Sequence, residues 1–294
     1  MSFRLFANFS RPDGIYFLAL LDNGEMMKKS LVLSLFILCI VSAVTFGQSV
    51  GITKKDLSQA EIDRIIKTAT TNERLFRQAL NVYAFNRYAT IQTIGLGGQI
   101  TGTYRRDSFL TFNEAGERYE KILFAPISTL TEITISAADI DNLGGIDPFA
   151  IEPKVADQYN FTFLGKEHID ELDLFVFDVE PKIVPDAKKG IAKFFSGRIW
   201  IDDKDLLIVK SKGKAVPEGK ERFPVMETWR ENIDGKYWFP TLSIADSELV
   251  FDKGQVVKMK VRVHYKDYKV GRSEVRILDD EPDKPTPTPT PKKP

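Results

Sequence analysis

The residues that most often carry catalysis are scarce in this chain. Its 294 residues include two histidines, His168 and His264, and one cysteine, Cys39. Neither histidine has a second ligand at the spacing with which a helix holds zinc. The sequence also lacks a nucleophile-elbow motif and a phosphate-binding loop. We therefore predict no catalytic residue, no metal site and no cofactor, and we expect that the protein is not an enzyme.

Two short motifs resemble functional ones but lack essential parts. Gly95-x-Gly97 has no third glycine, and a strand-like segment rather than a helix follows it, so it is not a dinucleotide fingerprint. Asp202, Asp203 and Asp205 could suggest calcium, but the glycine and the closing glutamate of a calcium loop are missing. We interpret the aspartates as a turn, because their side chains bond nearby backbone N–H groups.

With no catalytic or metal-binding motif found, the function that the sequence pattern still suggests is the binding of apolar groups. In the segment 172–177, LDLFVF, apolar side chains occupy both alternating faces of the predicted strand. The segments 206–209 and 237–239 show the same pattern. An antiparallel sheet with one face in water would alternate cleanly, so both faces here must be covered. Two interpretations stay open: a filled core, or a cavity for an apolar ligand.

If a cavity exists, acyl chains suit it, because they need only an apolar wall and gain ~0.8 kcal/mol for each buried CH₂. We place the cavity between the sheet and two predicted helices. Its candidate wall residues share an aromatic or aliphatic side chain on an apolar strand: Phe85, Ile91, Phe109, Phe163, Phe175 and Trp238. Their inward or outward direction is not fixed by the sequence.

The strands that would carry these residues follow one another through short turns. Asp234-Gly235 is a strong two-residue hairpin signal between two aromatic-rich segments. We expect at least one of Trp200, Trp229 and Trp238 to be buried in this meander. The predicted strands are 82–94, 99–113, 118–125, 159–166, 172–179, 195–202, 206–209, 226–232, 236–242, 249–252, 255–267 and 274–278. They predict a mainly β, α+β fold with one curved antiparallel sheet of about ten strands.

Two short helices are predicted before the first strand. Ser58 and Glu61 form a capping box, and isoleucines at helical spacing follow, which indicates a helix over 59–70. Asn72 is expected to cap a second helix ending at Leu80. A third short helix is predicted over 136–143. The first two would cover the concave face of the sheet.

The ends of the chain differ in character from the domain between them. Residues 27–47 have a basic start, an apolar run and small residues, as in a secretory signal peptide. Residues 1–26 are interpreted as an extended or misassigned start, with Met26 or Met27 as the true one. Residues 48–280 form the predicted domain, and the proline- and threonine-rich residues 281–294 a tail of polyproline type.

Four runs in this domain resemble bacterial outer membrane lipoprotein-sorting proteins. They are 119–130 (YEKILFAPISTL), 176–182 (VFDVEPK), 197–203 (GRIWIDD) and 234–241 (DGKYWFPT). The resemblance covers roughly Ser58 to Leu278. It implies a LolA/LolB-like fold, an unclosed antiparallel barrel with helices capping its concave face. It also implies a periplasmic carrier or sensor of acyl chains.

The sequence thus favours an exported, non-enzymatic protein that binds acyl chains of lipids or lipoproteins, with membrane-associated sorting machinery as a further partner. The alternative is an envelope structural or interaction domain with a filled core, tethered by its tail. A hydrolase would need a carboxylate pair that only the fold could assemble. The 41 basic and 41 acidic residues cancel, so the composition does not suggest a nucleic-acid partner.

Deletion of the segment from Pro282 to Pro294 should leave the melting temperature unchanged, because an extended proline-rich tail contributes no packed surface. Thermal unfolding of the truncated and full-length proteins tests this. A drop of several degrees in the truncated protein would show that the tail docks on the domain.

Overall fold

The computed structural model describes residues 51–113, 115–135, 139, 151–186, 193–219, 221–235, 237–252 and 254–271. All of them belong to one compact unit that begins at Val50. The predicted extended start, signal peptide, strand at 274–278 and tail lie outside the described residues. So does nearly all of the helix predicted over 136–143.

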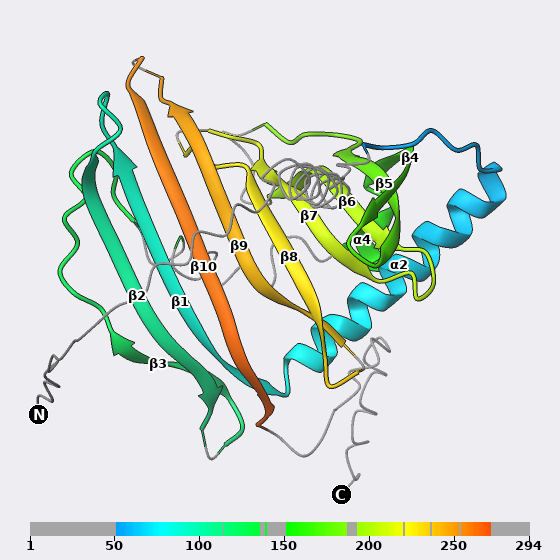
Figure 1. The fold of residues 1–294 in the computed structure, drawn as a ribbon, viewed down its shortest axis with the longest axis horizontal. Coiled ribbons are helices and arrows are strands. Elements are labelled where there is room, and N and C mark those ends of the chain that lie inside the picture. Colours follow the sequence, from blue (N-terminus) through cyan, green and yellow to red (C-terminus); the bar gives the residue numbers. More distant parts are fainter. Residues whose placement is uncertain are drawn as a thin grey trace, which may run out of the picture. The chain divides into compact units, whose positions relative to one another are not determined.

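The described residues form one antiparallel sheet of ten strands (Figure 1). Its order is β3-β2-β1-β10-β9-β8-β7-β6-β5-β4, and β3 and β4 are its two edges, so the sheet is not closed. This is the predicted mainly β architecture, a single unclosed antiparallel sheet. The strands are β1 (Tyr83–Ile94), β2 (Ile100–Phe112), β3 (Arg118–Phe124), β4 (Tyr159–Ile169), β5 (Leu172–Pro181), β6 (Phe194–Asp202), β7 (Ile208–Val216), β8 (Met226–Ile233), β9 (Tyr237–Val250) and β10 (Val256–Val270).

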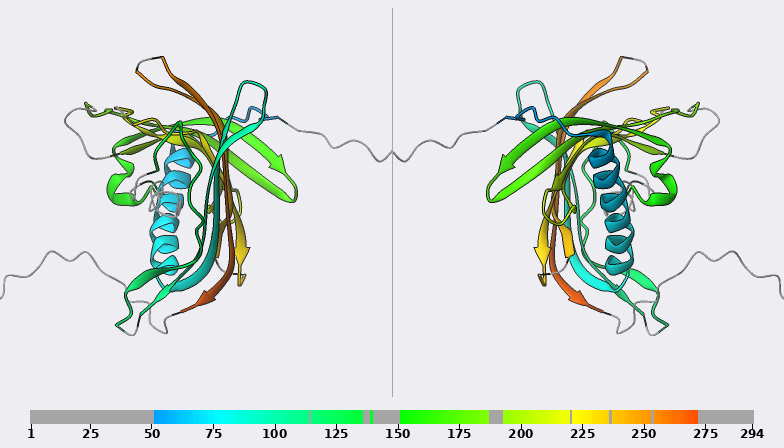
Figure 2. Two further views of the ribbon diagram at one scale, coloured as in Figure 1. Left: turned by 90° about the vertical axis from the view of Figure 1, so that its left-hand side faces the viewer. Right: turned by 90° about the vertical axis from the view of Figure 1, so that its right-hand side faces the viewer.

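Helix α2 (Gln59–Leu80) lies on one side of this sheet, and the strands curl around it (Figure 2). We call the side that carries α2 the inner face and the opposite side the outer face. The helix begins as predicted: Ser58 Oγ accepts from the N–H of Glu61, and the Glu61 carboxylate accepts from the N–H of Ser58. A second helix, α4 (Pro153–Ala156), is one turn long.

The prediction of two separate helices was wrong, because α2 continues through Asn72 without a break. Asn72 does not cap a new helix. Its side-chain Nδ2 donates to the carbonyl oxygens of Asp205 and Leu206, at 3.1 and 2.9 Å. The sequence suggested a local hydrogen bond for Asn72. Its side chain instead links the helix to the β6–β7 turn.

The strands predicted at 236–242 and 249–252 are parts of the single long strand β9. Pro240 lies within this strand although proline cannot donate a hydrogen bond to a neighbouring strand. The pairing of β9 with β10 ends at Leu242, however, so Pro240 lies beyond that ladder. Its missing N–H thus costs no hydrogen bond between β9 and β10.

Two predicted turns are confirmed. Asp234 and Gly235 have φ of 56° and 68°, the positive values that a tight hairpin needs at both central positions. At the β6–β7 turn, Asp202 Oδ2 accepts from the N–H groups of Lys204 and Asp205, at 3.2 and 2.9 Å. The carboxylate there organises the turn. Trp200, in the strand that leads into it, is 5% exposed, as the meander prediction required.

The apolar side chains collect into two clusters on the inner face and one on the outer face. The β1–β10 cluster has at its centre Phe76, Tyr83, Phe85, Ile91, Phe239, Val263 and Tyr265. The β5–β6 cluster has at its centre Ile65, Ala69, Phe175, Phe177, Phe195, Ile199 and Ile201. The outer cluster consists of Leu174, Val176, Trp200 and Val209. This explains the strands that are apolar on both faces, because β5 contributes side chains to both the β5–β6 cluster and the outer cluster.

An ion pair anchors α2 between the two inner clusters. Arg230 of β8 donates from Nη1 and Nη2 to the two carboxylate oxygens of Glu73, at 2.5 and 3.0 Å. The side chains of Glu73 and Arg230 are 1% and 10% exposed. The guanidinium also lies 4.3 Å from the ring centre of Phe76. One turn of helix toward the N-terminus, Ala69 packs into the β5–β6 cluster, so the ion pair divides the apolar stripe of α2.

Glu73→Gln should lower the free energy of unfolding by about 3–5 kcal/mol, because it leaves Arg230 buried without its counter-charge. Denaturation in urea measures the change. A double variant, Glu73→Leu with Arg230→Met, should recover most of the loss, since apolar replacements remove both charges together.

The matched control is Glu248→Gln, which removes a carboxylate from an exposed pair with Lys258 at 3.8 Å. Such exposed pairs contribute about 0–1 kcal/mol. If Glu73→Gln proves as mild as this control, the buried pair does not hold the helix on the sheet.

Candidate functional site

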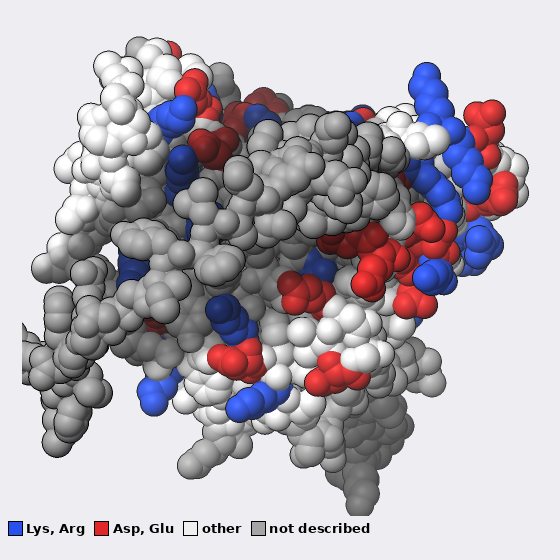
Figure 3. Space-filling view, in the orientation of Figure 1, with Lys and Arg blue, Asp and Glu red and all other residues white. Residues whose placement is uncertain are grey.

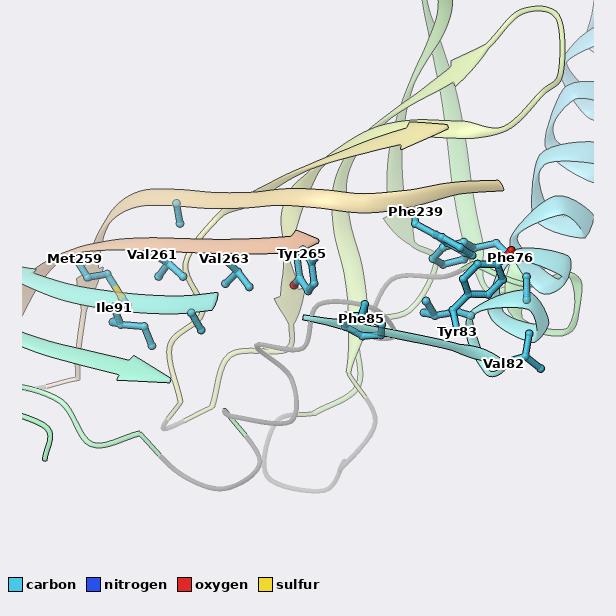
Figure 4. Packing of buried hydrophobic residues seen from close by; sticks show 14 of the residues in the cluster. Phe76, Val82, Tyr83, Phe85, Ile91, Phe239, Met259, Val261, Val263 and Tyr265 are labelled. Carbon is cyan, nitrogen blue, oxygen red and sulfur yellow. The ribbon is translucent and has the colours of Figure 1, made fainter. Parts of the chain in front are cut away.

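The candidate site is the inner face of the sheet under and beside α2. Figure 4 shows the β1–β10 cluster as a row that begins at the helix with Phe76, Phe239 and Tyr83. It continues past Phe85 and Tyr265 toward the far ends of β1 and β10. The rings of Tyr83 and Phe239 meet edge to face, with centres 4.8 Å apart. The row is a continuous apolar surface along two central strands.

The N-terminal half of α2 covers the second apolar surface, the β5–β6 cluster. Ile65 and Ala69 are 1% and 2% exposed against it. Phe163 of β4 packs edge-on against Phe175, with ring centres 6.1 Å apart. The two halves of the helix thus pack against two different apolar surfaces of one sheet.

A cleft of about 360 Å³ opens at the edge of α2. Ligand pockets commonly have about 300–1,000 Å³, so the cleft is large enough for part of a small ligand or acyl chain. Two of the residues that line the cleft are charged, Arg230 and Asp205. The cleft is lined by Asn72, Leu75, Phe76, Gln78, Ala79, Asp205, Leu207, Arg230, Tyr237 and Trp238.

The six predicted wall residues do not come together at one place. Phe85 and Ile91 belong to the β1–β10 cluster, and Phe163 and Phe175 to the β5–β6 cluster, all on the inner face. Phe109 pairs with Asn86, one residue out of step with the pair Phe85 and Leu110, so it points to the outer face. Trp238 packs against the outer cluster and also lines the cleft. That these residues bind a ligand stays a prediction.

A polar cluster on the inner face of β1, β2 and β3 was not predicted. The Glu120 carboxylate accepts from Arg87 Nη2 at 2.6 Å, from Arg106 Nε at 2.9 Å and from Arg106 Nη2 at 2.6 Å. Ser108 Oγ donates to the same carboxylate. One signal was present in the sequence: Arg87 stands at the same parity as Phe85, Ala89 and Ile91, and so interrupts an apolar row. Its meaning depended on knowing that this parity faces inward.

The electrostatics of this cluster strongly favour an ionised Glu120. The hydrogen bonds from Arg106 are the largest cause that lowers the pKa of Glu120 to about 2. Ser108 and the charge of Arg87 lower this pKa further, while burial opposes them. Glu120 is therefore a fixed negative charge at every physiological pH.

The two histidines, His168 and His264, both have charged neighbours in the structure. His168 Nδ1 lies 2.9 Å from Oδ1 of Asp173, and both side chains are more than half exposed. Burial, followed by the charges of Lys266 and Arg262, lowers the pKa of His264. In the part of the chain that the structure describes, no three His, Cys, Asp or Glu side chains are grouped to hold a metal ion.

Charge is evenly mixed on the face seen in Figure 3. Basic and acidic side chains lie next to one another there, outside the atoms drawn in grey. The view agrees with the equal numbers of basic and acidic residues in the sequence. No helix among the described residues has the length and apolar character that crossing a membrane requires.

Comparisons with known proteins find relatives in structure rather than in sequence. No family model and no curated protein matches the chain. Among solved structures, a DUF1329 family protein from Desulfovibrio piger is 15% identical, with a TM-score of 0.37, over 72% of this chain and 94% of that one. A domain from Vibrio parahaemolyticus, described as an outer membrane lipoprotein-sorting protein domain, is 11% identical with a TM-score of 0.29, over 70% and 94%. MucB is 14% identical with a TM-score of 0.24, over 71% and 93%.

Glu120→Gln should lower the free energy of unfolding at pH 7 by about 1.5–3 kcal/mol, the contribution of hydrogen bonds to a charged group. The folded pKa of about 2 lies below the ordinary value of 4.5. The stabilisation is therefore complete above pH 4.5 and is lost as the pH falls toward 2. Urea denaturation of parent and variant at several pH values should show their difference shrinking over this interval.

Glu248→Gln, at an exposed position, again provides the control for the loss of a carboxylate. A difference between parent and Glu120→Gln that stays constant from pH 7 to pH 2 would contradict this account of the cluster.

Proposed function

We propose that this protein is an exported, non-enzymatic carrier or sensor that binds acyl chains of lipids or lipoproteins in the cell envelope. The ligand contacts the inner face of the sheet and enters at the cleft beside α2. The periplasm is the proposed location, and membrane-associated sorting machinery is a proposed partner. The signal-like residues 27–47 and the sequence resemblance support both.

The observation that carries this proposal is the construction of the inner face. Two apolar clusters lie side by side on one open sheet, and a single amphipathic helix covers part of both. The cleft of about 360 Å³ adjoins the C-terminal half of that helix, where Phe76 and Ala79 belong both to its wall and to the β1–β10 cluster. An acyl chain in the cleft would thus extend an apolar surface that already exists.

The ion pair between Glu73 and Arg230 fits the same role. The pair is buried and fixes the helix at one point, while apolar contacts hold the helix on either side, and Arg230 also lines the cleft. Apolar contacts are not directional, so they can be exchanged for contacts with a ligand. A binding surface of this kind needs no reactive group.

The alternative, an envelope structural or interaction domain with a filled core, also has an observation in its favour. Phe177 and Phe239, one in each inner cluster, are both 0% exposed. Side chains packed to this degree leave no room for a ligand where they stand. On this reading the cleft is a surface depression and the tail tethers the domain.

Leu75→Lys should weaken the binding of a fluorescent fatty acid by about tenfold, or ~1.4 kcal/mol. Leu75 lines the cleft but is 47% exposed, so a lysine there should leave the fold intact. Probe titration and thermal unfolding measure the two effects. The matched control is Leu123→Lys on β3, at a residue that is 52% exposed and does not line the cleft.

Native mass spectrometry of protein purified from a membrane-containing host separates the two functions directly. An additional mass that corresponds to a lipid supports the carrier. A clean protein mass, together with unchanged probe binding in both lysine variants, would replace the carrier with the filled-core domain.

A further inference from the structure

The polar cluster on β1, β2 and β3 holds more positive than negative charge. Arg87, Arg106 and Arg118 lie on the inner face, and Glu120 is the carboxylate that pairs with the first two. Arg118 donates to the carbonyl oxygen of Tyr83 at 2.9 Å and to that of Leu80, and it lies over two phenylalanine rings. Three guanidinium groups and one carboxylate give these four residues a net charge of two positive units.

Glu120 has little capacity left to compensate for this excess. Its Oε1 accepts from Arg87, Arg106 and Ser108, and its Oε2 accepts from Arg106. Four hydrogen bonds from three side chains therefore already converge on this one carboxylate, three of them on Oε1.

Two further donors are buried there without one. Arg87 is 3% exposed, and its Nε has no hydrogen-bond partner among the described residues. The hydroxyl of Tyr104 is also buried and has no hydrogen-bond partner in the described part of the chain. Tyr104 and Arg106 stand two residues apart on β2, so their side chains leave the strand on the same face. Leaving such groups unpaired lowers the stability of the fold, so proteins seldom do so without a reason.

An apolar surface adjoins these donors on the same face. Arg87 lies between Phe85 and Ala89 in the inward row of β1, and its cross-strand neighbour is Tyr265 on β10. Tyr104 pairs with Ile91, and its ring packs against the β1–β10 cluster. Leu130 and Ile133 lie outside regular secondary structure and are only partly buried where they meet this cluster. The site therefore combines buried cationic donors with adjacent apolar contact area.

We infer that Arg87, Arg106 and the Tyr104 hydroxyl bind the anionic headgroup of an acyl lipid, a carboxylate or a phosphate, while its chain packs on the β1–β10 cluster. The headgroup supplies the acceptors that Arg87 Nε and Tyr104 lack, and its charge offsets the excess of arginine. Hydrogen bonds from a guanidinium group to an oxyanion are among the strongest hydrogen bonds in proteins, and two arginines can share one anion. This inference rests on the proposed function and narrows the ligand to anionic lipids.

The test compares three ligands of one chain length: palmitate, hexadecyl phosphate and hexadecanol. Each displaces a fluorescent fatty-acid probe from the full chain, and inorganic phosphate and acetate are titrated separately. We expect at least one of the two anionic lipids to bind about tenfold or more tightly than hexadecanol, and the free ions to bind far more weakly. Palmitate and hexadecyl phosphate then distinguish a carboxylate from a phosphate site.

Tyr104→Phe is the sharpest variant, because it removes only the unpaired hydroxyl. The preferred anionic lipid should bind about tenfold more weakly, the effect of one lost hydrogen bond to a charged group. Binding of hexadecanol and the melting temperature should not fall. Tyr119→Phe is the matched control, since Tyr119 is 46% exposed and adjoins Glu120 on the opposite face of β3. Arg106→Gln should also reduce the preference for the anion while leaving Arg87 paired with Glu120.

The outcomes separate this inference from the proposed function. Equal binding of anionic and neutral lipids would overturn the headgroup site and leave the acyl-chain carrier in place. Absence of binding by all three would overturn both. Free phosphate or acetate that binds as tightly as the lipids would show an anion site without a lipid role. A loss of melting temperature in Tyr104→Phe would show that the hydroxyl has a partner in the protein, which also overturns the inference.

Discussion

The fork of hydrogen bonds between Glu73 and Arg230 is the constraint on which the arrangement of the inner face depends. A helix that packs only through apolar contacts can rotate or slide on a sheet at small cost, because such contacts have no preferred direction. A buried charge pair cannot, since any displacement leaves two charges in a medium of low dielectric constant. The pair thus sets which residues of α2 face the sheet, and with them the position of the cleft.

The same pair divides the inner face into two apolar surfaces with different surroundings. The N-terminal half of α2 closes over the β5–β6 cluster, whereas only the last turns of the helix touch the β1–β10 cluster. The row that runs along β1 and β10 therefore extends well beyond the helix (Figure 4). On the proposed function, this part of the inner face is where a long apolar ligand would pack.

The two buried polar arrangements differ in how completely their groups are paired. Glu73 and Arg230 satisfy each other, which makes their pair suitable as a fixed anchor. In the cluster around Glu120 the arginines outnumber the carboxylate, and two donors have no acceptor among the residues that the structure describes. Buried groups that a protein leaves unsatisfied are costly, and a ligand that satisfies them gains affinity and orientation together.

The sequence by itself determined what depends on near neighbours in the chain. The capping box of Ser58 and Glu61, the hairpin at Asp234-Gly235 and most strands could be predicted, because local hydrogen bonds and side-chain alternation specify them. Only the tertiary structure decided which face of each strand points inward, since a shift of one residue exchanges the two faces. Phe109 points outward for this reason. Arg87 and Glu120 are 33 positions apart in the sequence, and β2 lies between their strands in the sheet. No local sequence pattern could therefore predict that the two side chains form a pair.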